Sequence, residues 1–193
     1  MSFTMKNAKW AGLSVLLVSG ASYASFVPLF SGTTPGPATN TTFNYDLNFS
    51  TGQLPTGQPI ERLESGDFLT IYDILGFVSA TAPAGFSVAT QNTGVNGFGT
   101  VPNDDPALTN VTFTYTGATV TTNTNFPGAN IVSNFGFLGQ DNFTSEDTGN
   151  APPNNGQPIG QIGLVTVPSD VIPEPSILGL GALGAMTMLR RRK

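Results

Sequence analysis

Carboxylates are the side chains of this sequence that are best suited to chemistry. The chain has 12 Asp and Glu residues and neither His nor Cys, and residues 25–172 contain no Lys and one Arg, Arg62. This middle region therefore excludes Ser-His-Asp and Cys-His catalysis, Schiff-base lysines and zinc bound through nitrogen or sulfur. Two carboxylate chemistries remain. One is a glycosidase pair, with carboxyl groups about 5 to 10 Å apart, and the other is a calcium site built from oxygen ligands.

Two short acidic stretches carry the candidate calcium ligands. "VPNDDPALTN" places Asp104 and Asp105 in a predicted turn, and "GQDNFTSEDTGN" adds Asp141. Neither stretch has the ligand spacing of an EF-hand loop. Asp and Asn are also common turn residues, because their side chains bond to the neighbouring backbone. We therefore expect turns here, keep these three aspartates as candidate metal ligands, and expect no other cofactor.

Sugar chemistry is the second possibility that the acidic residues leave open. Sequence spacing does not show which of them could form a hydrolytic pair, and acids on turns and outward strand faces are ordinary, so we expect no enzyme. Sugars commonly stack on Trp, and the one Trp of the chain is Trp10, near the N-terminus. Tyr45, Tyr72 and Tyr115 lie within strand patterns, where we expect them to be core or barrel-edge residues.

Alternating apolar and polar residues predict the strands that would position these groups. "TTFNYDLNFS" (41–50) alternates aromatic or aliphatic residues with polar ones, and "NVTFTYTG" (110–117) does the same. "GDFLTIYDILGF" (66–77) is apolar on both faces and is predicted to be a central strand. Further strands are predicted at four windows: 85–90, 118–122, 131–138 and 163–167.

Turn sequences rich in Gly, Pro and Asn separate these windows, and no long helical period occurs in the middle of the chain. The pattern predicts an all-β fold. It would be a single antiparallel β-sandwich of the jelly-roll or Ig-like kind, with about seven or eight strands, over residues 25–170. A signal helix is expected before this domain and a hydrophobic helix after it.

The N-terminal 24 residues have the order of parts of a secretory signal peptide. Lys6 and Lys9 precede the apolar run 10–18, and small residues follow it. Cleavage by signal peptidase is expected between Ala24 and Ser25. The middle of the chain would then lie outside the cytoplasm.

The C-terminal residues 171–193 contain three parts in a fixed order. Pro173, Glu174 and Pro175 come first, an apolar segment (176–189) follows, and the chain closes with a basic cluster, Arg190, Arg191, Arg192 and Lys193. The two prolines favour an extended backbone that a protease can bind. A helix over the apolar segment would rise about 21 Å, a marginal span for a hydrocarbon core of about 30 Å. The basic cluster would stay on the cytoplasmic side.

In these residues, together with the signal peptide, the chain resembles the PEP-CTERM proteins of Gram-negative bacteria. The resemblance covers the C-terminal segment 171–193 and does not extend to the middle of the chain. It implies that an exosortase recognises the tail and cuts near Pro-Glu-Pro, after an intermediate anchored in the inner membrane. It also implies a setting in which bacteria make exopolysaccharide. An unprocessed C-terminal membrane anchor is the alternative.

The charge of the middle region restricts its partners. Eleven carboxylates and one guanidinium give residues 25–172 a net charge near −10, which disfavours nucleic acid and anionic lipid. We therefore expect an exported structural or adhesive protein of the cell surface or extracellular matrix, linked to exopolysaccharide or biofilm. The alternatives are a non-catalytic calcium- or carbohydrate-binding module and a carboxylate-only polysaccharide hydrolase.

Overall fold

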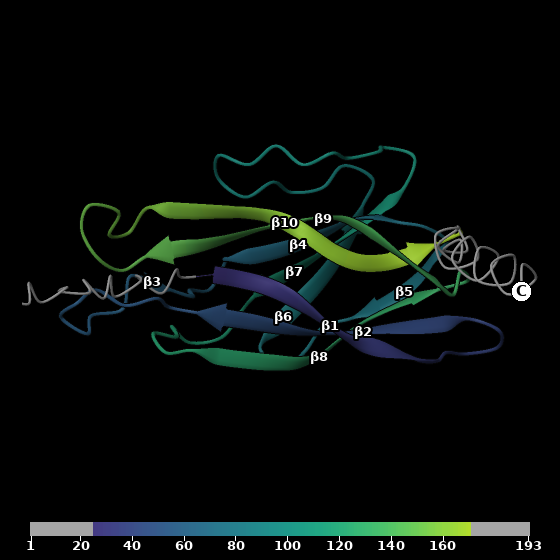
Figure 1. The fold of residues 1–193 in the computed structure, drawn as a ribbon, viewed down its shortest axis with the longest axis horizontal. Coiled ribbons are helices and arrows are strands. Elements are labelled where there is room, and N and C mark those ends of the chain that lie inside the picture. The colour runs from purple at the N-terminus through teal and green to yellow at the C-terminus, as the bar shows by residue number, and fades with distance from the viewer. Residues whose placement is uncertain (1–24, 171–193) are drawn as a thin grey trace, which may run out of the picture.

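Two antiparallel β-sheets packed face to face form the protein in a computed structural model that describes residues 25–170 (Figure 1). The four-stranded sheet has the order β1-β2-β8-β5, and the six-stranded sheet has the order β10-β9-β4-β7-β6, with β3 paired to β9. The strands are β1 (Ser25–Pro35), β2 (Thr41–Ser50), β3 (Glu61–Arg62), β4 (Phe68–Ile74), β5 (Phe77–Thr81), β6 (Phe86–Gln91), β7 (Thr109–Tyr115), β8 (Thr124–Ser133), β9 (Phe137–Gly149) and β10 (Pro158–Ser169).

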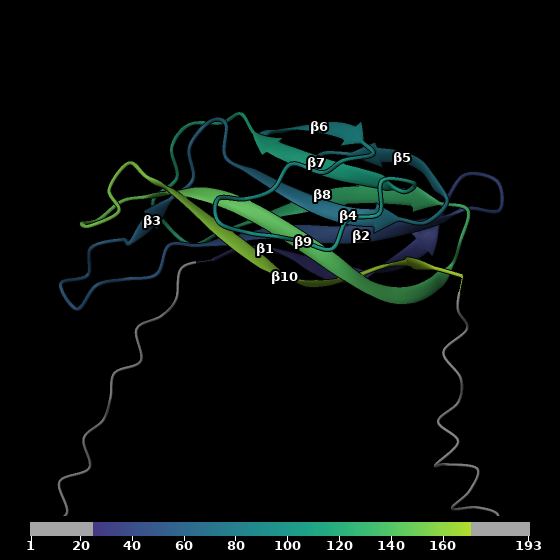
Figure 2. The same cartoon turned by 90° about the horizontal axis from the view of Figure 1, so that it is seen from above.

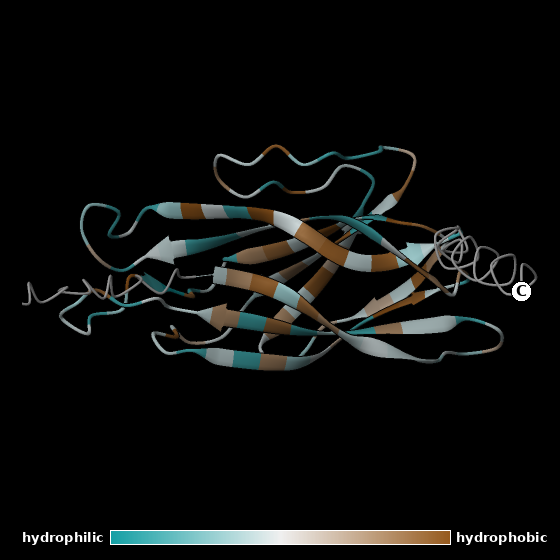
Figure 3. Ribbon diagram, viewed as in Figure 1, coloured by the Kyte–Doolittle hydropathy of each residue, from teal (hydrophilic) through white to brown (hydrophobic). Residues whose placement is uncertain are grey.

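The core lies between the two sheets and follows the predicted alternation. On β2, Phe43, Tyr45, Leu47 and Phe49 are all fully buried, because every second side chain of a strand points to the same face. Apolar residues accordingly form bands along the strands in Figure 3. The all-β sandwich is thus confirmed, whereas its jelly-roll or Ig-like kind stays a prediction.

β4 is central, as predicted from its apolar residues, and lies between β9 and β7. The predicted strand was too long, however. The window 66–77 runs past a turn at Leu75 and Gly76 into β5, which belongs to the other sheet. Gly76 has φ +61°, and a Cβ there would lie 1.9 Å from Asn134 Oδ1. Only glycine fits this turn.

Three further predictions about strands were wrong. The window 118–122 contributes only an isolated bridge, between Val120 and Leu63, and the window 131–138 spans the turn between β8 and β9. β1, β3, β5 and the long β9 were not predicted as separate strands, so the described residues contain ten strands and not about seven or eight. β9 was missed because its polar residues resemble a loop, although they lie in the middle of a sheet.

A long loop, 92–108, crosses the outer face of the six-stranded sheet (the teal loop at the top of Figure 1). The hydroxyls of Thr70 and Tyr72 on β4 donate hydrogen bonds of 2.9 and 2.8 Å to the Val95 carbonyl of this loop. Both faces of β4 are therefore covered, which explains why its sequence lacks alternation. Tyr45, Tyr72 and Tyr115 are buried, as expected.

β1 begins and β10 ends toward opposite ends of the sandwich (Figure 2). Within residues 25–170, no helix is long and apolar enough to cross a membrane. The expected signal helix and C-terminal helix lie outside the described residues.

Replacing a buried aromatic residue tests the core. Phe113→Ala should lower the free energy of unfolding by about 3–5 kcal/mol, because it leaves a cavity between the sheets. Phe98→Ala is the matched control, since 65% of the Phe98 side chain is exposed, and it should change stability by less than about 0.5 kcal/mol. Urea unfolding measures both values, and equal losses in the two variants would contradict the assigned core.

Candidate functional site

Asp73 lies at the end of β4 in a backbone conformation that non-glycine residues rarely adopt, with φ +55°. The ladder between β4 and β7 shifts register between Ile71 and Ile74. The buried side chain of Asn110 holds this distortion, because its Oδ1 accepts the Asp73 N–H at 2.8 Å. The Asp73 side chain therefore points toward the loop 92–108, which buries it. There its carboxylate accepts the Asp105 N–H.

The three predicted metal ligands gather around Asp73. The pKa of Asp73 is raised to about 6, mainly by burial. The Asp105 N–H opposes this rise, and the nearby charges of Asp141, Asp104 and Asp105 contribute to it. Burial also raises the pKa of Asp141, and the charge of Asp104 adds to this effect. The sequence placed these residues in two separate stretches, and the fold brings them together.

Most of the carboxylate oxygens of this cluster already accept hydrogen bonds from the protein. Asp104 accepts from the Asn110 amide at 2.8 Å and from the Gly94 N–H at 3.0 Å. Asp105 accepts from the Ala107 N–H at 2.9 Å, and Asp141 accepts from the Asn142 N–H at 2.7 Å. In the part of the chain that the structure describes, no group of three or more acidic side chains is placed to hold a metal ion. The candidate ligands accept N–H groups as turn residues commonly do, and calcium binding by them is untested.

A shallow cavity of about 260 Å³ opens beside this cluster. Its lining includes Asp73, Asp141 and Asp170, together with the end of β10. The cavity is thus acidic and lies where β10 leaves the sheet.

A second acidic group lies at β3 and β9. The carboxyl groups of Glu61 and Asp147 are buried, with exposed fractions of 7% and 3%, and they share a hydrogen bond. The pKa of Asp147 is raised to about 9, mainly by burial, with contributions from Glu61 and Asp67. Burial also raises the pKa of Glu61. The second oxygen of Asp147, Oδ1, is buried without a hydrogen-bond partner. The Asp147 carboxyl group therefore keeps its proton at neutral pH and donates a hydrogen bond to Glu61.

This pair does not fit the hydrolytic alternative. Glycosidase carboxyl groups flank a substrate and lie about 5 to 10 Å apart, whereas Glu61 and Asp147 are in hydrogen-bond contact inside the protein. No substrate can enter between them. The pair joins β3 to the C-terminal end of β9.

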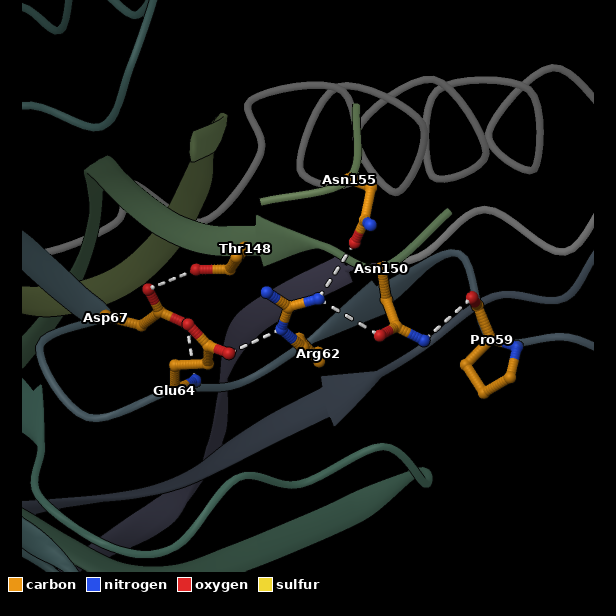
Figure 4. A network of polar contacts seen from close by, with 7 residues as sticks. All are labelled: Pro59, Arg62, Glu64, Asp67, Thr148, Asn150 and Asn155. Carbon is orange, nitrogen blue, oxygen red and sulfur yellow. Dashed lines mark hydrogen bonds and ion pairs between the residues drawn. The ribbon is translucent and has the colours of Figure 1, made fainter. Parts of the chain in front are cut away.

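Arg62 is the single cation of residues 25–170, and it is committed to a local network (Figure 4). It forms an ion pair with Glu64, and its Nη1 donates to the Oδ1 atoms of Asn150 and Asn155 at 3.2 and 3.0 Å. The Asn150 amide in turn donates to the Pro59 carbonyl at 3.2 Å. The guanidinium thus ties the turn between β9 and β10 to β3 and leaves the Glu61–Asp147 pair without a cation.

Asp67 completes this network. Its carboxylate accepts the Glu64 N–H at 2.6 Å and the Thr148 hydroxyl at 3.1 Å. Burial nevertheless raises the pKa of Asp67 to about 6. Asp67 and Asp147, which both lie at this end of the sandwich, therefore have raised pKa values.

The signals for these groups in the sequence are uneven. Asp73 stands alone in the apolar run "FLTIYDIL", and a single carboxylate in such a strand is a recognisable sign of a special environment. Glu61 and Asp147 carry no such sign, because each has polar or charged neighbours and the two are far apart in the chain. Their pairing depends on the register between β3 and β9.

The remaining candidate site is the C-terminal segment. Residues 171–193 match the family described as PEP-CTERM protein-sorting motif. The chain therefore ends in a PEP-CTERM sorting motif. This motif implies an exported protein that an exosortase sorts and processes at the membrane. No curated protein and no solved structure matches the chain.

The motif directly follows the folded domain. β10 ends at Ser169, and the motif begins at residue 171. Pro173, Glu174 and Pro175 and the basic cluster 190–193 lie outside the described residues. For the expected signal-peptide cut, Ala24 also lies outside them, whereas Ser25 is the first residue of β1; this cut stays a prediction.

Buried acids with raised pKa values should make the domain most stable in acid. Well below pH 4 these groups are protonated in both the folded and the unfolded chain. As the pH rises, the unfolded chain loses its protons first, so stability falls through pH 6 for Asp67 and Asp73 and through pH 9 for Asp147. Urea unfolding between pH 4 and 9 measures this loss.

Asp147→Asn should raise the free energy of unfolding at pH 8 by at least about 1 kcal/mol, because an amide stays neutral in both states. Asp170→Asn removes the same charge at an exposed position and is the control. If Asp147→Asn were no more stable than Asp170→Asn at pH 8, the protonated pair would be refuted.

Calcium should leave the melting temperature unchanged relative to EDTA, since backbone and amide N–H groups already occupy oxygens of Asp104, Asp105 and Asp141. A ligand that binds the native state must raise its stability. A calcium-dependent rise that Asp141→Asn abolishes, and that Asp46→Asn on β2 of the other sheet does not, would instead establish a metal site at Asp73.

Proposed function

We propose that this chain is an exported, exosortase-processed protein with a structural or adhesive role at the cell surface or in the extracellular matrix, linked to exopolysaccharide or biofilm. The observation that carries the proposal is the sorting motif at 171–193, directly after the last strand of a folded domain. Signal peptidase releases the N-terminus, and an inner-membrane-anchored intermediate precedes the cut near Pro-Glu-Pro.

The chemistry of the described domain supports a role without catalysis. Its Glu61–Asp147 pair is buried and protonated, its single cation is held by Glu64 and two asparagines, and the oxygens around Asp73 bond to backbone amides. The net charge near −10 of residues 25–172 also argues against nucleic acid as a partner.

A carbohydrate-binding module is the second candidate, because one groove has suitable chemistry. The groove has a volume of about 490 Å³ and is lined by Phe98, Asn154, Gln157 and neighbouring residues, without a charged side chain. The Phe98 ring is 65% exposed, although its backbone N–H is fixed by Glu146 Oε2 at 2.9 Å. An exposed ring beside two amides could bind a neutral sugar through apolar contact and hydrogen bonds.

A deletion strain complemented with sorting variants tests the main proposal. The wild-type chain should restore matrix cohesion, and intact-mass spectrometry of its matrix form should show the loss of everything beyond about Glu174. A chain with Pro173→Ala, Glu174→Ala and Pro175→Ala should keep Lys193, stay with the membrane fraction and fail to restore cohesion. Ser176→Ala, next to Pro-Glu-Pro, is the control and should behave as wild type.

Three results would contradict the proposal. Lys193 in the mature wild-type protein would refute processing, and normal cohesion in the deletion strain would refute the structural role. Release of reducing sugar by the purified wild-type protein would favour the hydrolase.

A further inference from the structure

β10 differs from the other edge strands of the sandwich. Proteins protect sheet edges with short strands, prolines, bulges and charged residues. β1 has Pro28 near its middle and a register shift between Phe30 and Gly32, β5 has 5 residues and a register shift, and β6 has 6 residues. β10 has 12 residues and pairs with β9 without a register shift, and its two prolines lie near its ends. Like the other edge strands, β10 contains no charged residue.

Two observations indicate which backbone groups β10 presents at its open edge. Pro158 and Pro168 lack an N–H, so within a sheet their nitrogens belong on the unpaired side. The Tyr45 hydroxyl, which comes from the other sheet, donates to the Thr166 carbonyl at 2.8 Å. These three residues have even numbers, so the same side carries the backbone N–H and C=O groups of Gly160, Ile162 and Leu164.

Apolar side chains lie beside these backbone groups. Ile162 is 47% exposed and Leu164 is 66% exposed, and both are on the outer face of the strand, while Val165 and Val167 are buried. β10 runs along the edge of the six-stranded sheet in Figure 1. An open, uncharged edge with exposed Ile and Leu is a surface that pairs with another strand.

We propose that β10 pairs with β10 of a second copy of this chain, antiparallel and centred on Gly163, so that the two six-stranded sheets become continuous. In this register Ile162 of each copy lies opposite Leu164 of the other, and Gly160 lies opposite Thr166. The prolines then face each other at the two ends, where no N–H is lost. In other registers a proline lies opposite a residue whose backbone carbonyl could have accepted a hydrogen bond, and that hydrogen bond is lost.

Net charge opposes the association of two copies, because two domains with a net charge near −10 repel each other. A contact strand without charged residues adds no further repulsion between the paired backbones. The pairing is isologous, since the same strand serves on both sides, and it closes as a dimer. The inference goes beyond the proposed function and does not depend on it, because it rests only on the edge of one sheet.

Lysine substitutions test the pairing in the purified exported protein. Sedimentation equilibrium should show a concentration-dependent dimer for the wild type. Leu164→Lys and Ile162→Lys should each weaken association at least about tenfold, because an ammonium group would be buried against an apolar side chain. Val78→Lys is the matched control, since Val78 is 49% exposed on edge strand β5, and it should associate as the wild type does. Circular dichroism verifies that each variant is folded.

Cysteine cross-linking tests the register, and the chain has no native Cys to interfere. A mixture of Ile162→Cys and Leu164→Cys proteins should form a mixed disulfide dimer in preference to either homodimer, because residues directly opposite in antiparallel strands have the Cα separation that a disulfide needs. A wild type that stays monomeric, a dimer unaffected by both β10 lysines, or no preference for the mixed disulfide would each overturn the proposal.

Discussion

The scarcity of positive charge is the constraint on which the rest of this structure depends. One guanidinium serves residues 25–170, so their carboxyl groups are stabilised in ways that need no cation. Asp73, Asp104 and Asp105 accept backbone N–H groups, and Asp147 keeps its proton and bonds to Glu61. The strand ends and the loop 92–108 are therefore joined by carboxyl-to-amide bonds where other proteins use salt bridges.

Neutral polar groups extend the same solution across the outer face of the six-stranded sheet. The hydroxyls of Thr70, Tyr72 and Thr144 all bond to the Val95 carbonyl, which fixes the loop over β4. Such bonds do not weaken with added salt as exposed ion pairs do. A domain held by apolar burial and neutral hydrogen bonds is suited to the variable ionic conditions outside a cell, in agreement with its sorting motif.

The sorting motif and the sandwich meet at β10. This strand contributes Val165 and Val167 to the core, lines the acidic cavity near Asp73 and ends at Ser169, just before the motif. Processing at the motif and pairing at the edge would therefore act on adjacent parts of the chain. A cut after β10 would release the domain without removing β10, so its edge would remain available to pair with a second copy.

Local patterns in the sequence determined the fold class, the strand β2 and the C-terminal motif. Alternation in "TTFNYDLNFS" specifies a strand by itself, and the motif is read from its order of residues. β9 escaped prediction because its polar side chains are buried by β3, β4 and the loop 92–108, which are distant in sequence. Asp73 could be suspected from its apolar neighbours, but the raised pKa of Asp147 could not. Only the tertiary structure brought Asp147 into contact with Glu61 and buried both residues. A carboxyl pKa depends on burial and on the charges that the fold brings close to it.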